Sequence, residues 1–317
     1  MKTAVLINIP FYTYNDEIIA SLKEKGYDVI HFSYKPTVTS FQKFRFKYSK
    51  SYQKKTIKKL VNNISEKLKD IDVDVFIFIN PTTFKESDVK KIFENHEKAK
   101  KVLYLWDAIA TYPIVKEIFG CFDKIYSFDL IDSKENGFEY RPTFASKEIL
   151  ACRDQKPELD NDVFYIASYS KARYFQLLEM EKLCLENNLK FKYHLYVRNK
   201  LAYFFFKLQN PKLKKRYVST HVMTNDEKKE ILLKSKAIFD TPLTTQTGIT
   251  MRVIEGMILN KKIITTNKYI TDFDFYNPND FLVFNENFDI NKIKSECSYK
   301  IDPNYYSVNS LVEDLLK

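Results

Sequence analysis

The chain has 317 residues, of which 44% are hydrophobic and 15% aromatic, enough for two domains of roughly 150 residues with buried cores. No run approaches the roughly 18 apolar residues that cross a bilayer, no signal-peptide pattern is found, and the four cysteines form no CxxC pair. These features argue against a membrane-spanning protein, a disulfide-rich secreted protein and a His/Cys metal site, and we expect a cytoplasmic protein. The net charge of +10 favours an anionic partner: nucleic acid, an acidic membrane surface or a phosphorylated substrate.

In the first half of the chain, apolar runs of strand length alternate with helical patterns. Strands are predicted at residues 3–9, 28–34, 73–79, 101–106 and 124–128. Helices are predicted at residues 16–25, 52–69, 85–96, 114–119 and 132–137. This alternation indicates β-α-β units and a parallel sheet. The loop after the first strand, residues 9–15, has no GxGxxG pattern, so a dinucleotide fingerprint is absent.

A basic segment interrupts this pattern. Residues 42–69 contain ten Lys or Arg side chains against a single acid, Glu66, with aromatic residues interleaved in the first part. For residues 52–69 we expect a Lys-rich helix with a solvated face. For residues 41–52 two interpretations remain: an ordinary exposed loop, or a basic-aromatic surface that contacts a membrane or an anionic acceptor.

Two predicted strands of this half end on an acid. Asp107 follows Trp106, the only tryptophan, and Asp129 follows the next strand. The carboxyl ends of parallel strands carry the ligand-binding loops of open α/β sheets. Asp107 first, and Asp129 second, are therefore candidates for a catalytic base. The alternative for Asp107 is a structural role as the cap of the next turn.

A polar stretch at residues 150–161 is predicted to link the first domain, residues 1–150, to a second α/β domain, residues 151–317. The strands of the second domain are predicted at residues 163–167, 190–197, 217–218, 235–240, 261–266 and 281–284. A helix is predicted at residues 307–316. Ser168 and Arg173 lie at the start of the helix that follows the first of these strands. Arg198 follows the second strand, and an exposed basic first turn is the alternative interpretation for Arg173.

The segment of residues 198–216 is basic and aromatic. It carries seven basic residues and no acid around the apolar centre LAYFFFKL. Such a segment fits an interfacial membrane helix. A connector packed on the core is the alternative, and the sequence does not decide between them.

The segment of residues 239–267 combines a strand end, a polar loop, a helix predicted from about Gly248 to Leu259, and a further strand. The N-terminus of a helix at a sheet's carboxyl edge suits a phosphate, because its N–H groups are unpaired. Arg252 lies about one turn after Gly248 and could reach the same anion. Glu255 could accept hydrogen bonds from ribose hydroxyls. The alternative is an ordinary helix start with a solvated Arg and Glu.

The pattern QTGxTxRxxE, followed by KKxITTN, resembles the donor-binding segment of GT-B glycosyltransferases, and is similar to the CgeB-like enzymes of bacterial capsule and lipopolysaccharide synthesis. The run YLWD…YP…FDKIYSFD resembles the same group. The resemblance implies two Rossmann-like domains with a cleft between them and a C-terminal helix that crosses back. It implies that Glu255 holds the ribose and Arg173 the diphosphate. The earlier Glu of the family's usual pair falls on Thr247, a departure that leaves the sugar contact open.

The predicted function is transfer of a sugar from a nucleotide-sugar donor to a glycan or lipid-linked glycan, without a metal or other cofactor, in the cytoplasm or at the inner face of the membrane. The predicted donor-site residues are Ser168, Arg173, Arg198, Gln246, Thr247, Gly248, Thr250, Arg252 and Glu255. Two alternatives remain: a catalytically silent nucleotide-sugar or glycan-binding protein of the same shape, and a nucleic-acid-binding protein. The latter is disfavoured because no recognition motif is present.

Overall fold

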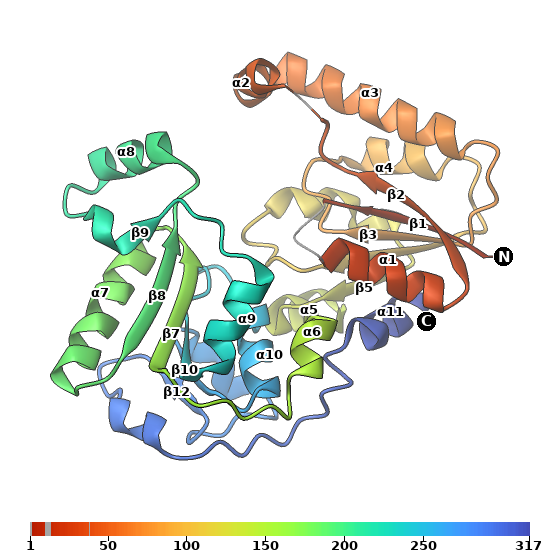
Figure 1. Cartoon of the computed structure of the whole chain (residues 1–317). Helices are drawn as coiled ribbons and strands as arrows, with labels where there is room; N and C mark the ends of the chain where they lie inside the picture. Colours follow the sequence, from red (N-terminus) through yellow and green to blue (C-terminus); the bar gives the residue numbers. More distant parts are fainter. Residues whose placement is uncertain (1, 10–13, 38) are drawn as a thin grey trace. The chain divides into compact units, whose positions relative to one another are not determined.

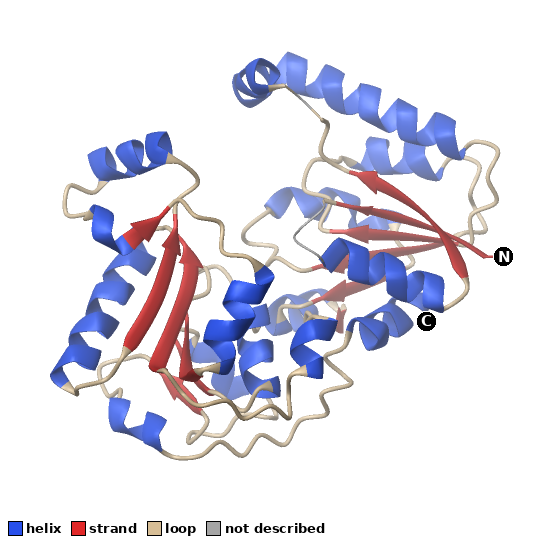
Figure 2. Cartoon of the chain, viewed as in Figure 1, coloured by secondary structure: helices blue, strands red, loops and turns tan. Residues whose placement is uncertain are grey.

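The computed structural model describes residues 2–9, 14–37 and 39–317, and the chain forms two compact units. The first unit comprises Met1–Ser146 together with Asn304–Lys317, and the second comprises Lys147–Pro303. Each unit contains a six-stranded parallel sheet with helices on both faces (Figures 1 and 2). This architecture confirms the predicted α/β fold of two Rossmann-like domains. Within the described ranges, no helix combines the length and hydropathy needed to span a membrane.

The sheet of the first unit has the order β2-β1-β3-β4-β5-β6. Its strands are β1 (Lys2–Asn8), β2 (Tyr27–Ser33), β3 (Val75–Ile79), β4 (Lys100–Leu105), β5 (Lys124–Ser127) and β6 (Glu139–Tyr140). The central strand β3 is buried at all five positions, as expected for a parallel strand covered on both faces. The strand order reverses between β1 and β3, which creates a switch point at the carboxyl edge.

Helices of the first unit bury the sheet from two sides. The helices are α1 (Tyr14–Glu24), α2 (Ser40–Tyr48), α3 (Lys50–Leu68), α4 (Glu86–Phe93) and α5 (Leu130–Asn136). α3 and α4 share one hydrophobic core with the sheet and with η1 (Pro113–Cys121). The segment of residues 114–119 was predicted as an ordinary helix but forms this 3-10 helix, which begins at Pro113 just after the loop behind β4.

The C-terminal helix α11 (Val308–Leu316) belongs to the first unit, as predicted for a helix that crosses back, and it packs beside α1. Its anchor is Arg141, which is 2% exposed and pairs through Nε with Asp314 Oδ2 at 2.9 Å. Arg141 Nη2 also donates to the Tyr305 carbonyl at 2.7 Å. The guanidinium lies over the Tyr305 ring, 4.2 Å from its centroid. A buried charge is tolerated here because it is paired and hydrogen-bonded.

The sheet of the second unit has the order β12-β11-β10-β7-β8-β9, which is the strand order of the dinucleotide-binding fold. Its strands are β7 (Asn161–Ser168), β8 (Phe191–Tyr196), β9 (Val218–Ser219), β10 (Ser235–Asp240), β11 (Lys262–Thr265) and β12 (Phe281–Val283). Its helices are α6 (Lys147–Ala151), α7 (Lys171–Glu186), α8 (Lys200–Gln209), α9 (Asn225–Leu233) and α10 (Met251–Ile258). The short 3-10 helices of this unit are η2 (Lys215–Tyr217), η3 (Lys268–Asp272) and η4 (Ile290–Lys294).

Two local features position the helices of the second unit. Thr224 and Glu227 form a reciprocal capping box at the start of α9. Gly256 lets α10 approach the sheet closely, because a Cβ at this position would lie 2.3 Å from Ile263 Cδ1 and 2.7 Å from Ile238 Cδ1. The role of Gly256 is therefore helix-to-sheet packing.

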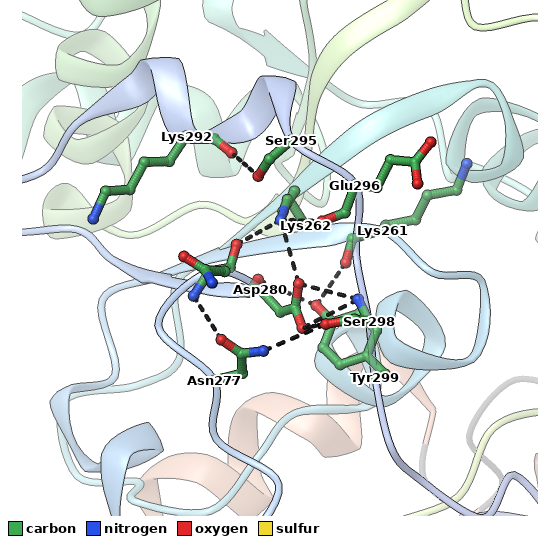
Figure 3. Close-up of polar contacts among 10 residues, drawn as sticks. Lys261, Lys262, Asn277, Asp280, Lys292, Ser295, Glu296, Ser298 and Tyr299 are labelled. Atoms are coloured by element: carbon green, nitrogen blue, oxygen red, sulfur yellow. Dashed lines mark hydrogen bonds and ion pairs between the residues drawn. The ribbon is translucent and has the colours of Figure 1, made fainter.

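A buried ion pair links residues 279–298 to the sheet of the second unit (Figure 3). Lys262 and Asp280 are each 1% exposed, and Lys262 Nζ lies 3.3 Å from Asp280 Oδ1. Lys262 Nζ also donates to the carbonyls of Asn279 at 2.5 Å and Glu296 at 2.8 Å. Asp280 in turn accepts from the Ser298 amide at 3.2 Å. Every partner lies within the second unit, so this cluster is a structural tie for residues 279–298.

Candidate functional site

The carboxyl ends of β7 and β10 meet at the switch point of the second sheet. These two strands pair in parallel at its centre, with β8 beyond β7 and β11 beyond β10. The chain therefore leaves the two central strands in opposite directions, and the loops that follow them diverge. Ser168 ends β7 and Asp240 ends β10. Ligands of open α/β sheets bind at this point of the edge.

Asp240 organises the side chains at this edge. It is 1% exposed, and its Oδ1 accepts hydrogen bonds from Thr250 Oγ1 at 2.8 Å and from Arg252 Nε at 2.9 Å. Arg252 Nη2 lies 2.9 Å from the same oxygen. Thr265 Oγ1, at the end of β11, donates to Oδ2 at 3.4 Å. The carboxylate thus fixes both the start of α10 and the guanidinium of Arg252.

Arg173 lies in the first turn of α7, where Ser170 caps the helix. Its Nε donates to the carbonyl of Thr241 at 2.9 Å, and its Nη1 donates to the carbonyl of Ser168 at 3.3 Å. Burial, and then the positive charge of Arg252, lower the pKa of Arg173. Both guanidinium groups bond to the end of β10, Arg252 to the side chain of Asp240 and Arg173 to the carbonyl of the next residue, Thr241.

Each of the two arginines has a terminal nitrogen that is available to donate hydrogen bonds to a ligand. Within the described residues, Nη2 of Arg173 and Nη1 of Arg252 have no hydrogen-bond partner in the protein. Two positive charges face one carboxylate, Asp240, so the cluster carries a net positive charge. Fixed guanidinium donors beside the N-termini of α7 and α10 are the arrangement that binds phosphate groups.

The loop between β10 and α10 is held by a side chain from a different loop. Asn267 Nδ2 donates to the carbonyl of Thr247 at 2.9 Å and to that of Gly248 at 3.4 Å. Inside the loop, the backbone N–H of Gln246 donates to the carbonyl of Leu243 at 2.9 Å. The prediction that the helix starts near Gly248 was wrong by three residues. Thr250 is the cap and α10 begins at Met251, because the Thr250 hydroxyl can bond the Val253 amide while also reaching Asp240.

Glu255, which was predicted to face the ribose, is buried. It is 1% exposed, and its Oε1 accepts from Lys228 Nζ of α9 at 2.7 Å. Arg198 lies two residues beyond β8 and is exposed. The structure therefore brings Ser168, Arg173, Thr250 and Arg252 together at the switch point. Glu255 lies on the buried side of α10, against α9.

Three residues of this cluster were not predicted: Asp240, Thr265 and Asn267. Asp240 has a visible signal, since it is the last residue of the strand predicted at residues 235–240 and is an acid at a strand end, as Asp129 is. The other two gave none. They lie 15 and 17 residues after Thr250 in the sequence and come near it only because β11 pairs with β10.

In the first unit, Asp107 lies just beyond β4 and takes part in a small polar cluster. Its Oδ2 accepts from Asn80 Nδ2 at 2.6 Å. Asn80 follows β3 in the left-handed region, with φ of +50°, a conformation that Asn adopts more readily than most residues. Burial raises the pKa of Asp107 to about 6, although the Asn80 hydrogen bond and the charge of Lys35 oppose the shift.

Asp129, the second candidate base, acts as the N-cap of α5. It is 1% exposed, and its Oδ1 accepts from the amides of Ile131 at 3.1 Å and Asp132 at 3.2 Å. Asp129 therefore has a structural role as the cap of α5. Asp107 lies beside Asn80 and combines partial burial with a raised pKa.

The basic segment of the first unit forms α2 and α3 with a groove of about 710 Å³ beside them. The groove lining includes Arg45, Lys55 and Lys59, and the Arg45 guanidinium lies 4.5 Å from the centroid of the Tyr52 ring. The side chains of residues 41, 43 and 44, part of the basic-aromatic surface predicted at residues 41–52, lie outside the described part, as does that of residue 40. So do residues 10–13 of the loop after the first strand.

No three His, Cys, Asp or Glu side chains in the described ranges are grouped as metal ligands.

No family model and no curated protein matches the sequence. Solved structures do match the whole chain. A glycosyltransferase from Rickettsia africae is 13% identical, with 100% of this chain and 99% of that chain covered and a TM-score of 0.58.

Two further structures share the architecture. A UDP-GlcNAc 2-epimerase from Methanocaldococcus jannaschii, solved with UDP-GlcNAc and UDP, is 11% identical over 99% of both chains, with a TM-score of 0.57. A UDP-forming α,α-trehalose-phosphate synthase from Burkholderia xenovorans is 10% identical over 100% of this chain and 95% of that chain, with a TM-score of 0.61. At these identities the likeness establishes the fold: the chain has the two-domain architecture of these three structures.

Proposed function

We propose that the protein is a glycosyltransferase that binds the diphosphate of a nucleotide-sugar donor at the β7/β10 switch point. The observation that carries the proposal is the pair Arg173 and Arg252, held in place by backbone carbonyls and by Asp240. Each has a terminal nitrogen without a protein partner in the described ranges. A diphosphate would supply acceptors for both nitrogens and would be attracted by the net positive charge.

The leaving group of such a transfer is a nucleoside diphosphate, on which negative charge accumulates as the sugar–oxygen bond breaks. Arg173 and Arg252 are positioned to stabilise that charge, together with the first amides of α7 and α10. Two fixed cations can perform this role without a metal, and metal independence is part of the proposal. Donors that are already oriented need little reorganisation when the charge develops.

The acceptor hydroxyl needs a base, and we assign this role to Asp107. Its pKa of about 6 leaves it mostly ionised near neutral pH while making it a stronger base than an ordinary aspartate. Asp129 is less suited to the role because its Oδ1 already accepts two backbone N–H groups. The proton of the hydroxyl moves to the Asp107 carboxylate while the acceptor oxygen attacks the sugar carbon.

The acceptor proposed here is a growing surface glycan of the capsule or lipopolysaccharide type, and the resemblance of QTGxTxRxxE to the CgeB-like enzymes supports it. A location at the inner face of the cell membrane belongs to the same proposal. For Glu255 we retain a ribose contact as a prediction, and it requires that the Lys228 pair opens when the nucleotide binds.

Fluorescence thermal shift with UDP, GDP, CMP, dTDP and their sugars tests the donor site, because a ligand that binds only the folded state raises the melting temperature. We expect one nucleotide to stabilise the wild type. Loss of a charge-assisted hydrogen bond should weaken its binding about 10- to 150-fold in Arg173→Ala. Arg252→Lys keeps the positive charge beside Asp240 and should weaken binding less than Arg252→Ala. Arg153→Ala, which removes an exposed arginine beside Asp154, is the control.

A turnover assay separates the related functions. A glycosyltransferase releases the nucleoside diphosphate when a glycan acceptor is added, and Asp107→Asn should slow that release without abolishing donor binding. The shared architecture favours a UDP-GlcNAc 2-epimerase as the second candidate. That enzyme would convert UDP-GlcNAc with no acceptor present. Binding without either reaction would indicate a silent binding protein. If no nucleotide binds and a short oligonucleotide does, the glycosyltransferase proposal is refuted.

A further inference from the structure

Helix α8 presents an apolar stripe that no other part of its unit covers. Leu201, Phe204, Phe205 and Leu208 are 64%, 57%, 54% and 62% exposed. They occupy positions i, i+3, i+4 and i+7, which lie on one face of a helix. No residue of α8 is fully buried. Exposed large apolar side chains that gather on one face mark an interaction surface.

The opposite side of α8 is anchored to its own unit. Tyr203 and Phe206 pack against the core of the second unit. The Phe206 ring lies 4.5 Å from the ring of Tyr169, in the loop that follows β7, and Asn210 Nδ2 donates to the Tyr169 hydroxyl at 3.4 Å. Packing on the core, one of the two interpretations of residues 198–216, therefore applies to one side of α8, and the membrane interpretation stays a prediction for the other. One face of the segment is a packed connector, and the other is open.

Basic residues flank the apolar stripe of α8 in the sequence. Residues 198–216 include seven basic residues and no acid. Six of the seven are exposed, namely Arg198, Lys200, Lys212, Lys214, Lys215 and Arg216. Lys207 is the partly buried member of the set, and its Nζ donates to the carbonyls of Pro211 at 2.6 Å and Leu213 at 2.7 Å. The segment therefore combines an apolar stripe of two helical turns with cations on both sides of it in the sequence.

We propose that α8 docks the second unit onto an anionic lipid bilayer, with Leu201, Phe204, Phe205 and Leu208 inserted at the headgroup boundary and the flanking cations on acidic headgroups. A bilayer offers an apolar layer and a negative surface together, and this is the combination that α8 complements. Figure 1 shows α8 at the end of the second unit beyond β8 and β9. Because α8 rests on the loop after β7, docking holds the β7/β10 edge near the membrane.

The test is cosedimentation of the purified full chain with vesicles, without nucleotide, so that it does not depend on the proposed donor site. We expect binding to phosphatidylcholine vesicles that contain phosphatidylglycerol, weak binding to phosphatidylcholine alone, and a decrease with rising salt. The double variant Phe204→Ser/Phe205→Ser should bind at least about tenfold less tightly. Leu185→Ser removes an apolar side chain that is 71% exposed on α7, and it should bind as the wild type does.

A charge variant tests the second half of the proposal. Lys214→Glu/Lys215→Glu should weaken binding to the acidic vesicles more than Lys292→Glu/Lys300→Glu, which makes the same change in net charge at exposed positions elsewhere in the unit. Equal binding by the wild type and Phe204→Ser/Phe205→Ser overturns the proposal. It is also overturned if the wild type is a dimer in solution and that double variant is a monomer, since the stripe would then join two copies of the chain.

Discussion

Asp107→Asn is expected to make the protein more stable near neutral pH while impairing catalysis. The carboxyl of Asp107 has a pKa of about 6 in the folded chain, against an ordinary value of 3.8, and burial is the main cause. Folding therefore favours the protonated acid. Between pH 4 and pH 6 the folded protein holds a proton that the unfolded chain has released, so its stability falls as the pH rises through this window.

The size of the effect follows from the two pKa values. The gap is about two pKa units, and each unit corresponds to about 1.4 kcal/mol, so the ionised carboxylate costs up to about 3 kcal/mol above pH 6. Asparagine carries no charge and keeps an oxygen that can accept from Asn80 Nδ2. The free energy of unfolding of Asp107→Asn should therefore exceed that of the wild type by up to about 3 kcal/mol at pH 7. The difference should vanish below about pH 4.

Urea unfolding of the full chain at a series of pH values measures this difference. Asp28→Asn removes the same charge from an exposed position of β2 and is the control. A gain that is the same at every pH, or a loss of stability at pH 7, would refute the reasoning. The pH profile of kcat/KM offers a second check. Activity that depends on ionised Asp107 should fall as the pH drops through about 6.

Two further substitutions test the packing that positions the site. Gly256→Ala should destabilise the second unit by about 1–2 kcal/mol, because the new Cβ collides with Ile263 Cδ1 and better helix propensity offsets only part of the cost. Gly120→Ala is the control and should not destabilise the protein, because no atom lies within 4 Å of its new Cβ. Arg141→Met should cost about 2–3 kcal/mol and speed hydrogen exchange in α11, since Asp314, only 22% exposed, loses its buried partner and retains an ion pair with the exposed Lys317. Unchanged exchange in α11 would show that apolar contacts alone hold this helix.

The strands and their carboxyl ends could be predicted because their signals are local. The strand at residues 235–240 was predicted with the bounds that the structure gives to β10. The arrangement of apolar runs and helices was enough to indicate two parallel sheets. Acids at strand ends are visible in the sequence, and the fold dictates that they lie at a common edge. The position of these acids at the sheet edge therefore follows from the sequence, even where the residues that they contact do not.

Burial and pairing of the polar side chains could not be predicted in the same way. Glu255 and Lys228 are 27 residues apart, and nothing local to either indicates that the carboxylate is buried between α9 and α10. The start of α10 depends on a choice between Gly248 and Thr250. Thr250 is the cap because its hydroxyl reaches Asp240, a contact set by tertiary packing.

The negative charge of Asp240 opposes a phosphate and partly neutralises Arg252, and by itself this would weaken an anion site. In the structure, Asp240 instead orients the guanidinium of Arg252. Thr250 Oγ1, Arg252 Nε and Arg252 Nη2 all converge on Oδ1 of Asp240, so the carboxylate fixes the plane of the guanidinium and points the remaining terminal nitrogen away from itself. An arginine held in this way loses little side-chain entropy on binding. Arg173 then supplies the uncompensated positive charge. On this reasoning, affinity for the diphosphate comes from the charge of one arginine and the preorganisation of the other.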